Sequence, residues 1–411
     1  MNMLLRGASL IDGTGADPLP AAAVRIEGDR IAAVRDGGRG DQVLDLEGCT
    51  LLPGLIDAHT HLGIAYDFAE GARAGMVPAA EIAAAIFENC GLALDSGFTT
   101  CRDMAGLDGG IVQAIGKGMV RGPRILPSAT ALAQDGGHGT FMAPWSDCHC
   151  AVAIPGLIDA VAVCNGPDEV RLAARRAFRR GARQLKLFLS GGVISLTDEL
   201  SDTQLATDEI RAAVAEAEAR STYVAAHAHN NRAIRNGLAA GVRCFEHGTF
   251  LDADTAQAMA SAGAFLVPTL TIAHVLRTSP KALGVPESVA ARVGEASANM
   301  AAAIRHARAA GVTIGSGSDL LGPKQNQRGM ELVLRAEIEG AMAAIVSATA
   351  TNAKILGLEQ TIGTVEVGKI ADLVAVRGDP LAEPALFGDP ERVVLVIQEG
   401  KIRKHLAFDG R

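Results

Sequence analysis

The stretch LLPGLIDAHTHLG, residues 51–63, carries the clearest fold signal in the chain. Its apolar run is flanked by Pro and Gly and ends in Asp57-Ala58-His59-Thr60-His61. A short apolar run between turn residues is typical of a strand that is buried on both faces, as in a parallel sheet. Because residues two apart on a strand point to the same side, we expect His59 and His61 to share one face.

Similar apolar runs recur along the middle of the chain and alternate with Ala-rich helical patterns. The eight runs are residues 51–61, 98–102, 124–129, 184–190, 223–229, 242–247, 264–269 and 312–317. The helical patterns are residues 79–94, 169–180, 207–220, 232–240, 255–262 and 288–310. These strand-then-helix units predict an α/β fold, a TIM-like (β/α)8 barrel. A doubly wound open sheet gives no reason for eight units, and no GxGxxG motif follows the first run.

The two ends of the chain differ from the middle because they read as short β-strands. Residues 24–36 form two alternating runs around Gly28-Asp29, which is a hairpin signal. Residues 42–54, 363–380 and 393–405 repeat this pattern. We therefore predict a small composite β domain from residues 1–54 and 364–411, and a barrel domain from residues 55–363.

The composition argues against nucleic-acid and membrane partners. Lys and Arg number 38 against 46 Asp and Glu, a net charge of −8, and no long run is basic. Aromatic residues are 3% of the chain, so base stacking has little to work with. No apolar stretch approaches the ~18 residues of a membrane span, and the first residues lack a signal-peptide pattern. With seven Cys, an odd number, we expect reduced thiols and a cytoplasmic location.

The residues that end each run matter most, because barrel active sites lie at the carboxyl ends of the strands. In the fourth run, the leucines at 185, 187 and 189 would face the helices, which turns Lys186 toward the barrel axis. Burying an ammonium group is unfavourable unless it is paired or chemically neutralised. A lysine that has been carboxylated by CO2 is an anion and can bridge two metal ions.

Three further runs end in residue types that bind metals. They are His227-Ala228-His229, Glu246-His247-Gly248 and Gly315-Ser316-Gly317-Ser318-Asp319. Five strand ends together supply His59, His61, Lys186, His227, His247 and Asp319. Imidazole and carboxylate ligands with open coordination positions are typical of catalytic zinc, so this pattern predicts a metal-dependent enzyme.

At this point the sequence resembles the amidohydrolase superfamily, specifically its binuclear-metal branch. That branch includes Xaa-Pro and Xaa-Arg/Lys dipeptidases, N-acyl amino acid hydrolases and ochratoxinase. The matching motifs span nearly the whole chain: PGLIDAHTHLG (53–63), SGFTTCRDMAG (96–106), DGGHG (135–139), QLKLFLSGGV (184–193), VAAHAHNNRAI (224–234), FEHGTFLD (245–252), GSGSDLLG (315–322) and GKIADLVAV (368–376). The resemblance implies a barrel with a composite β-sandwich built from both termini.

The resemblance also implies roles for individual residues. The implied metal ligands are His59 and His61 on a buried ion, carboxylated Lys186 between two ions, His227 and His247 on a more exposed ion, and Asp319 on the buried ion. Asp319 would also transfer protons as the catalytic base and then acid. His138 matches a histidine that contacts substrate, and His229 stands where relatives have Tyr or His near the substrate carboxylate.

The implied reaction is amide hydrolysis by a hydroxide that two divalent ions, expected to be zinc, share. We expect a small-molecule substrate, an N-acyl or N-aminoacyl amino acid, and a homo-oligomeric enzyme. Residues 139–166 are mostly apolar and would cover the acyl group, while Arg232 joins the two substrate-side histidines as a candidate contact for the carboxylate. A carbamate, phenylurea, xenobiotic amide or lactone is the alternative substrate. A deaminase fits less well because it has no need of Lys186.

The substrate-side loops depart from the family pattern. Residues 139–166 lack the charges expected of peptidase relatives, residues 195–202 alter an SPTD-like loop, and Asn230-Asn231 follow His229 where Thr-Pro is common. The sequence therefore predicts the chemistry more strongly than the substrate. Cys148-His149-Cys150 has one residue between its cysteines, whereas structural zinc sites usually have two, so we interpret it as a thiol-rich loop.

Overall fold

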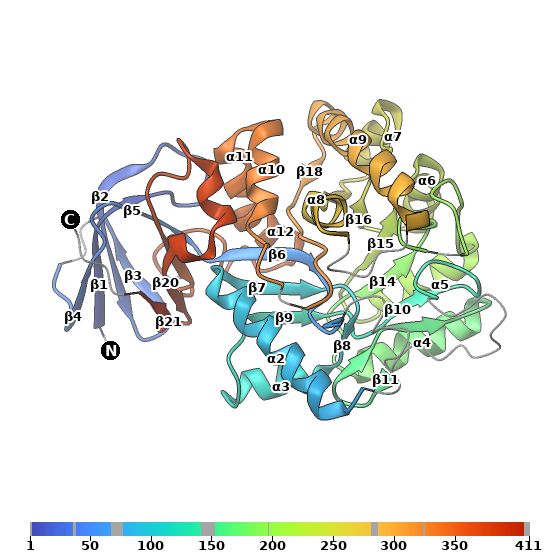
Figure 1. Ribbon diagram of the computed structural model, residues 1–411, viewed down its shortest axis with the longest axis horizontal. Helices are drawn as coiled ribbons and strands as arrows, with labels where there is room; N and C mark the ends of the chain where they lie inside the picture. Colours follow the sequence, from blue (N-terminus) through green and yellow to red (C-terminus); the bar gives the residue numbers. More distant parts are fainter. Residues whose placement is uncertain are drawn as a thin grey trace.

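The computed structural model describes residues 2–35, 38–66, 77–140, 153–195, 197–280, 287–323 and 325–406. The chain forms an α/β fold in which parallel strands are covered by helices, with a β-rich unit at one end (Figure 1). In the described part of the chain, no helix combines the length and apolar character needed to cross a bilayer.

The parallel strands follow the predicted runs. One sheet contains β6 (Leu55–Thr60), β7 (Phe98–Asp103) and β9 (Arg124–Pro127). The other contains, in order, β13 (Val161–Val163), β10 (Ala131–Ala133), β14 (Leu185–Phe188), β15 (Val224–Ala228), β16 (Cys244–His247), β17 (Phe265–Val267) and β18 (Thr313–Ile314). Each strand of this second series lies parallel to the next, as the buried apolar runs predict.

Two details depart from simple strands. Of the predicted third run, 124–129, only residues 124–127 form β9, and β10 follows beyond the run as a strand that was not predicted. Ala129 adopts a left-handed φ of 63° that interrupts the extended backbone between them. The last strand is only two residues long, but the chain beyond it still lies beside β6. Ala58 N donates to Ser316 O at 3.0 Å, and Asp319 N donates to His59 O at 2.7 Å. The first and last parallel strands are therefore neighbours, in agreement with the order expected of a barrel.

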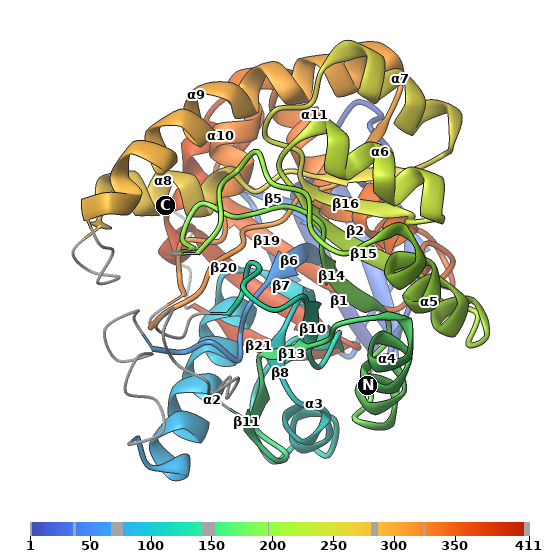
Figure 2. The same cartoon turned by 90° about the vertical axis from the view of Figure 1, so that its right-hand side faces the viewer.

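The predicted helices are present within a few residues of their expected bounds. They are α2 (Ala79–Asp95), α4 (Pro167–Arg179), α5 (Thr207–Glu218), α6 (Asn231–Ala240), α7 (Ala253–Ser261) and α9 (Glu287–Ala310). Helices that were not predicted are α3 (Gly109–Gly116), α8 (Leu270–Thr278), α10 (Met330–Glu339), α11 (Ala341–Val346) and α12 (Asn352–Ile355). Figure 2 shows α2 through α9 arranged around the strands. Leu185, Leu187 and Leu189 pack in a core to which α4, α5, α6, α7 and α9 contribute, as predicted.

Strands from both termini form one connected sheet of eight strands. Its members are β1 (Asn2–Leu10), β2 (Leu19–Glu27), β3 (Arg30–Val34), β4 (Gln42–Asp45), β5 (Cys49–Pro53), β19 (Leu373–Arg377), β20 (Val393–Gln398) and β21 (Lys401–His405). β2 and β3 form the hairpin predicted at Gly28, whose φ is 62°. β5 joins the two termini because it pairs with β1 on one side and β19 on the other.

The two faces of this sheet bury different side chains. Leu51 and Leu395 share a core with Leu5 of β1, inside the β-rich unit. Leu52 and Val374 face the other way and pack in the core that contains helix α2. One face of the sheet thus packs in the core of the β-rich unit, and the other face packs against the helical part of the chain. The division of the chain into domains at residues 54 and 364 remains a prediction.

Candidate metal centre and active site

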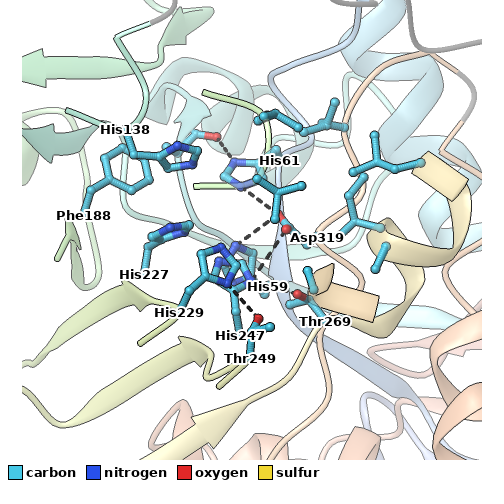
Figure 3. A pocket seen from close by; sticks show the side chains of 18 of the residues that line it. His59, His61, His138, Phe188, His227, His229, His247, Thr249, Thr269 and Asp319 are labelled. Atoms are coloured by element: carbon cyan, nitrogen blue, oxygen red, sulfur yellow. Dashed lines mark hydrogen bonds and ion pairs between the residues drawn. The ribbon is translucent and has the colours of Figure 1, made fainter. Parts of the chain in front are cut away.

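All eight residues predicted for the site line one cavity at the carboxyl ends of the parallel strands. His59 and His61 come from β6, Lys186 from β14, and His247 from β16, while Asp319 follows β18. His227 and His229 lie at the end of β15, and His138 follows β10. The cavity has a volume of about 100 Å³, and Figure 3 shows the imidazole rings directed toward one another across it.

Asp319 lies between the two histidines of β6. Its Oδ1 is 3.3 Å from His59 Nε2 and 3.1 Å from His61 Nε2. These three side chains have the spacing of a possible metal site. Burial alone would raise the pKa of Asp319, but the two histidines outweigh this effect and hold its pKa well below the usual range. The geometry agrees with the prediction that two residues spaced two apart on β6 share one face.

The hydrogen bonds that His59 and His61 make through Nδ1 leave the Nε2 acceptor of each ring directed at the same point. His59 Nδ1 lies 2.7 Å from Glu246 Oε2, and His61 Nδ1 lies 2.9 Å from Ala105 O. Because a carbonyl and an ionised carboxylate only accept, each Nδ1 carries a hydrogen and each neutral ring has its lone pair on Nε2. His59 Nε2 is buried and has no hydrogen-bond partner among the described residues.

A cation would satisfy this arrangement. Two imidazole lone pairs and a carboxylate oxygen converge on one point, which suits a divalent metal ion. Without metal, a proton can partly replace it: Asp319 raises the pKa of His61 although burial opposes the change. The residues therefore fit the metal ion that the family fold implies.

A second group of imidazoles lies beside the first. His227 and His247 have ring centroids 4.6 Å apart, and His247 Nδ1 is 3.8 Å from Asp319 Oδ2. His227 Nε2 donates to Gly191 O at 3.2 Å, which leaves its Nδ1 as an acceptor. Burial and the neighbouring histidines hold the pKa of both rings well below the ordinary value. Both are therefore neutral at pH 7, the form that binds metals.

Lys186 lies in the cavity with 1% of its surface exposed. No hydrogen bond or ion pair of its ammonium group is present among the described residues, and its Nζ lies 5.5 Å from the Phe188 ring centroid. Burial lowers the pKa of Lys186 to about 8, although Glu246 and Asp319 oppose this shift. The lysine is thus buried, as the strand pattern predicts, and it loses its proton more readily than an exposed lysine.

Two site residues have strained backbones. His247 has a φ of 70° and Asp319 a φ of 54°, both in the left-handed region that side chains other than glycine rarely adopt. Such strain persists where the surrounding structure over-determines it, and it concentrates at functional sites. His247 is the last residue of β16, and Asp319 lies in the segment that follows β18.

His138 is held on several sides. Its ring stacks on His227 with centroids 4.3 Å apart, and its Nδ1 lies 2.5 Å from Ser195 Oγ. Its backbone N–H donates to Gln204 Oε1 at 2.9 Å. Burial, with the charges of His229 and Lys186, lowers the pKa of His138 to about 3. A neutral ring in a fixed orientation is suited to a hydrogen bond with substrate.

His229 contributes a second neutral ring on the substrate side. Its Nδ1 lies 2.7 Å from Thr249 Oγ1, and burial lowers its pKa to about 4. Arg232 does not join it, which corrects the expectation from sequence. Arg232 is exposed on α6 and donates to Ser201 O at 3.3 Å, outside the cavity. The first turn of α6 carries its side chain away from the strand ends.

The opposite side of the cavity is apolar and was not predicted from sequence. We call it the apolar wall: Ile194, Ile272, Leu276, Val293, Met300 and Leu321. Ile272 and Leu276 come from α8, and Val293 and Met300 come from α9. A sequence signal exists for α9, because Val293, Ala296 and Met300 recur at helical spacing along one face.

Within the loop expected to cover the acyl group, residues 141–152, which include Cys148-His149-Cys150, lie outside the described residues. Of residues 139–166, Ala160 and Val161 line the cavity. Cys164 is buried, and its thiol hydrogen-bonds to Ala162 O at 3.4 Å. The five described cysteines are free thiols.

Parallel strands that carry histidines and an aspartate at their carboxyl ends define a class of α/β hydrolases that commonly work with metal ions. The chain belongs to the amidohydrolase family, which it matches over residues 50–403. It is a hydrolase that acts on amide C–N bonds.

Known relatives agree with this assignment. Ochratoxinase of Aspergillus niger is 32% identical over 367 residues, which cover 86% of this chain and 75% of that protein. A prolidase solved with N-methylphosphonate-L-proline is 37% identical with a TM-score of 0.92, over 99% of this chain and all of that one. A Xaa-Pro dipeptidase with methionine bound in its active site is 30% identical with a TM-score of 0.85, over 98% and 99% of the two chains.

Proposed function

We propose that this protein hydrolyses N-acyl or N-aminoacyl amino acids with two divalent metal ions, expected to be zinc, at the mouth of a (β/α)8 barrel. One observation carries the proposal. The Nε2 atoms of His59 and His61 lie 3.3 and 3.1 Å from Asp319 Oδ1. When both rings are neutral, all three atoms are hydrogen-bond acceptors, and no hydrogen lies between them. His227 and His247 would hold the second ion, beside Lys186.

Carboxylation of Lys186 would complete the ligand set. The reaction joins the neutral amine to CO2, forms an N–C bond and releases one proton, so it needs an uncharged Nζ. The lowered pKa of Lys186, about 8, makes that form available near neutral pH. The product is an anion, which converts an unfavourable buried ammonium into a ligand for cations.

Bound divalent ions supply a nucleophile from water near neutral pH and polarise the scissile carbonyl. Asp319 then has the proton-transfer role. Its low pKa keeps it ionised, and it can accept a proton from the attacking water and donate it to the leaving nitrogen. One carboxylate thus serves as base and then as acid.

The two sides of the cavity fit the two halves of such a substrate. His138 and His229 offer ring nitrogens to the polar, amino-acid half. The apolar wall would bind the acyl half, which favours a large apolar or aromatic acyl group. The names of the relatives, ochratoxinase and prolidase, are consistent with a substrate whose amine half is an amino acid.

A neutral substrate is the second candidate, and one observation favours it. Among the described residues that line the cavity, none is an arginine that could pair with a carboxylate. A carbamate, phenylurea, xenobiotic amide or lactone needs no such charge and would use the same metal ligands.

A substrate screen on zinc-loaded protein distinguishes the two. It should include N-acyl amino acids with aromatic and with short acyl groups, dipeptides, carbamates, ureas and lactones. We expect the highest kcat/KM for aromatic N-acyl amino acids. His229→Ala should raise KM more for these acids than for their primary amides, while His405→Ala on exposed β21 should change neither. Turnover of neutral compounds alone would contradict the carboxylate assignment and leave the metal chemistry intact.

A further inference from the structure

A buried ion pair lies directly behind the metal site and has no part in ligand binding. Arg102 of β7 and Glu246 of β16 are fully buried, and Arg102 Nη2 donates to Glu246 Oε1 at 2.7 Å. The other carboxylate oxygen, Oε2, accepts from His59 Nδ1 at 2.7 Å. The three side chains form a chain that runs from the sheet interior to the site.

Arg102 also fixes the backbone beside His59. Its Nε donates to Ala58 O at 2.5 Å, and Nη1 donates to Tyr223 Oη at 3.1 Å. The Arg102 guanidinium thus binds the Ala58 carbonyl, which precedes His59 in the chain, and the Glu246 carboxylate, which binds the His59 ring. Together these contacts fix the position of the imidazole. Because Arg102 carries a fixed positive charge and is buried against Glu246, the carboxylate is the anion of this ion pair.

We propose that Arg102 and Glu246 are positioning residues that fix the tautomer and orientation of His59 toward the metal ion. An ionised carboxylate accepts only, so the hydrogen of His59 stays on Nδ1 and the lone pair stays on Nε2. That Nε2 is buried and without a hydrogen-bond partner among the described residues, 3.3 Å from Asp319 Oδ1. This inference rests on the proposed function for the metal ion but not on any substrate.

Arg102 and Glu246 must act together, because one Glu246 oxygen accepts from Arg102 and the other accepts from His59. In Glu246→Gln, one side-chain oxygen faces two donors, Arg102 and His59. The amide NH2 group then either opposes the guanidinium or donates to His59 Nδ1, which moves the ring hydrogen to Nε2 and blocks metal binding. Replacing Arg102 by Met removes the competing donor and the buried charge, so the Gln oxygen can again accept from His59.

Metal retention against a chelator tests this proposal without any activity measurement. Zinc-loaded wild type, Glu246→Gln, Arg102→Met/Glu246→Gln and Tyr223→Phe are dialysed against graded chelator, and zinc is counted per folded chain. We expect the single Gln variant to hold zinc about 10–100-fold less tightly, the usual effect of losing such a partner. The double variant should regain part of this loss. Tyr223→Phe, which removes an Arg102 contact only, should match wild type.

Wild-type retention in Glu246→Gln, or a double variant that holds zinc no better than the single one, would overturn the proposal. Nitrogen-15 NMR of the metal-free wild type gives an independent test if the Gln variant does not fold. The His59 signals should show hydrogen on Nδ1, and hydrogen on Nε2 would contradict the assignment. Failure of wild type to bind any divalent ion would instead refute the proposed function, since the NMR result does not depend on metal.

Discussion

Asp319 combines three properties that a proton-transfer group at a metal site needs. It is placed by a strained turn at φ 54°, it is held ionised by His59 and His61, and it faces the cavity. Its neighbour Ser318 ties this turn to the first parallel strand, since Ser318 Oγ donates to Asp57 Oδ2 at 2.6 Å. Its position therefore depends on both ends of the series of parallel strands.

Asp319→Asn should lower kcat by roughly 10²–10⁴-fold and change KM little, because the amide keeps the shape but cannot take a proton. Steady-state kinetics on the best substrate of the screen measures this. An unchanged kcat would move the base role to another group, with His229 as the next candidate.

Lys186→Ala should abolish most activity and most of one metal equivalent, because the bridging carboxylate is lost. Adding a short carboxylic acid should restore part of both by filling the vacated space. Elemental analysis and kinetics with and without the acid measure the effect, with Lys117→Ala on the exposed surface as the control. A fully active Lys186→Ala enzyme is incompatible with the bridging role.

The sequence predicted which side chains line the cavity but not which residues hold them in place. His59 and Asp319 could be predicted because strand ends converge at one edge of a parallel sheet. Arg102 and Glu246 stood in the same motifs, but only the structure shows that their strands bring them together behind His59. A charged residue within a buried run on each of two strands was the available signal.

Among the elements, the segment after β14 determines how His138 is presented. Asp198 Oδ1 accepts from Gly192 N at 2.9 Å, and Gln204 Nε2 donates to Asp198 Oδ2 at 3.1 Å. Arg292 of α9 donates to Gly192 O at 3.2 Å, so the segment is tied to the apolar wall. His138 and the apolar wall thus share one support.

Gly192→Ala should displace the His138 ring, because the added methyl group would collide with it. A Cβ at this position would lie 2.1 Å from the ring of His138, and the backbone there is not left-handed. We expect kcat/KM to fall roughly 100-fold, as a displacement near 1 Å can cause, with zinc content unchanged. Gly91→Ala in α2, where a Cβ would meet nothing within 4 Å, is the control. Normal kinetics in Gly192→Ala would show that activity does not depend on this position of the His138 ring.

Helix α8 is held by a residue of another helix. Glu331 of α10 accepts from Thr271 N at 2.8 Å and from Thr271 Oγ1 at 2.9 Å, both through Oε2. Its Oε1 is buried and has no hydrogen-bond partner among the described residues. Burial raises the pKa of Glu331 to about 8, although Arg335 opposes the shift. The carboxyl group is therefore mostly protonated at neutral pH.

This shift predicts that stability falls as pH rises. The folded protein binds a proton that the unfolded chain releases near pH 4.5, so the free energy of unfolding decreases between about pH 4.5 and pH 8. The slope is at most about 1.4 kcal/mol per pH unit. Glu331→Gln should flatten this part of the Tm–pH profile, whereas Glu337→Gln, exposed on the same helix, should not. An equally steep profile in Glu331→Gln would refute the assignment.

Element bounds were predictable where apolar periodicity was long. Helix α9, expected at 288–310, is observed at Glu287–Ala310. The end of the third strand was not predictable, because the left-handed turn at Ala129 is made by a residue with no turn preference. Helix α8 was missed because its apolar residues face both the cavity and the core, which removes the polar side of the pattern.

For the whole molecule, the composite sheet positions the site indirectly. β5 belongs to that sheet, and after Gly54 the chain continues directly into β6, which carries His59 and His61. A Cβ at Gly54 would lie 2.2 Å from Thr99 Oγ1, so the two units approach closely there. The first strand of the site therefore continues directly from a sheet that both chain ends build, and the β-rich character of both ends could be predicted from the sequence. The homo-oligomer remains a prediction.

The metal content of the purified protein shows whether the site holds two metal ions. Protein produced with added zinc and bicarbonate, then freed of loosely bound metal, is measured by elemental analysis against protein concentration. We expect two divalent ions per chain, because the His59–His61–Asp319 group and the His227–His247 group would each bind one and carboxylated Lys186 would join them. One ion per chain, or none, under these conditions would contradict it.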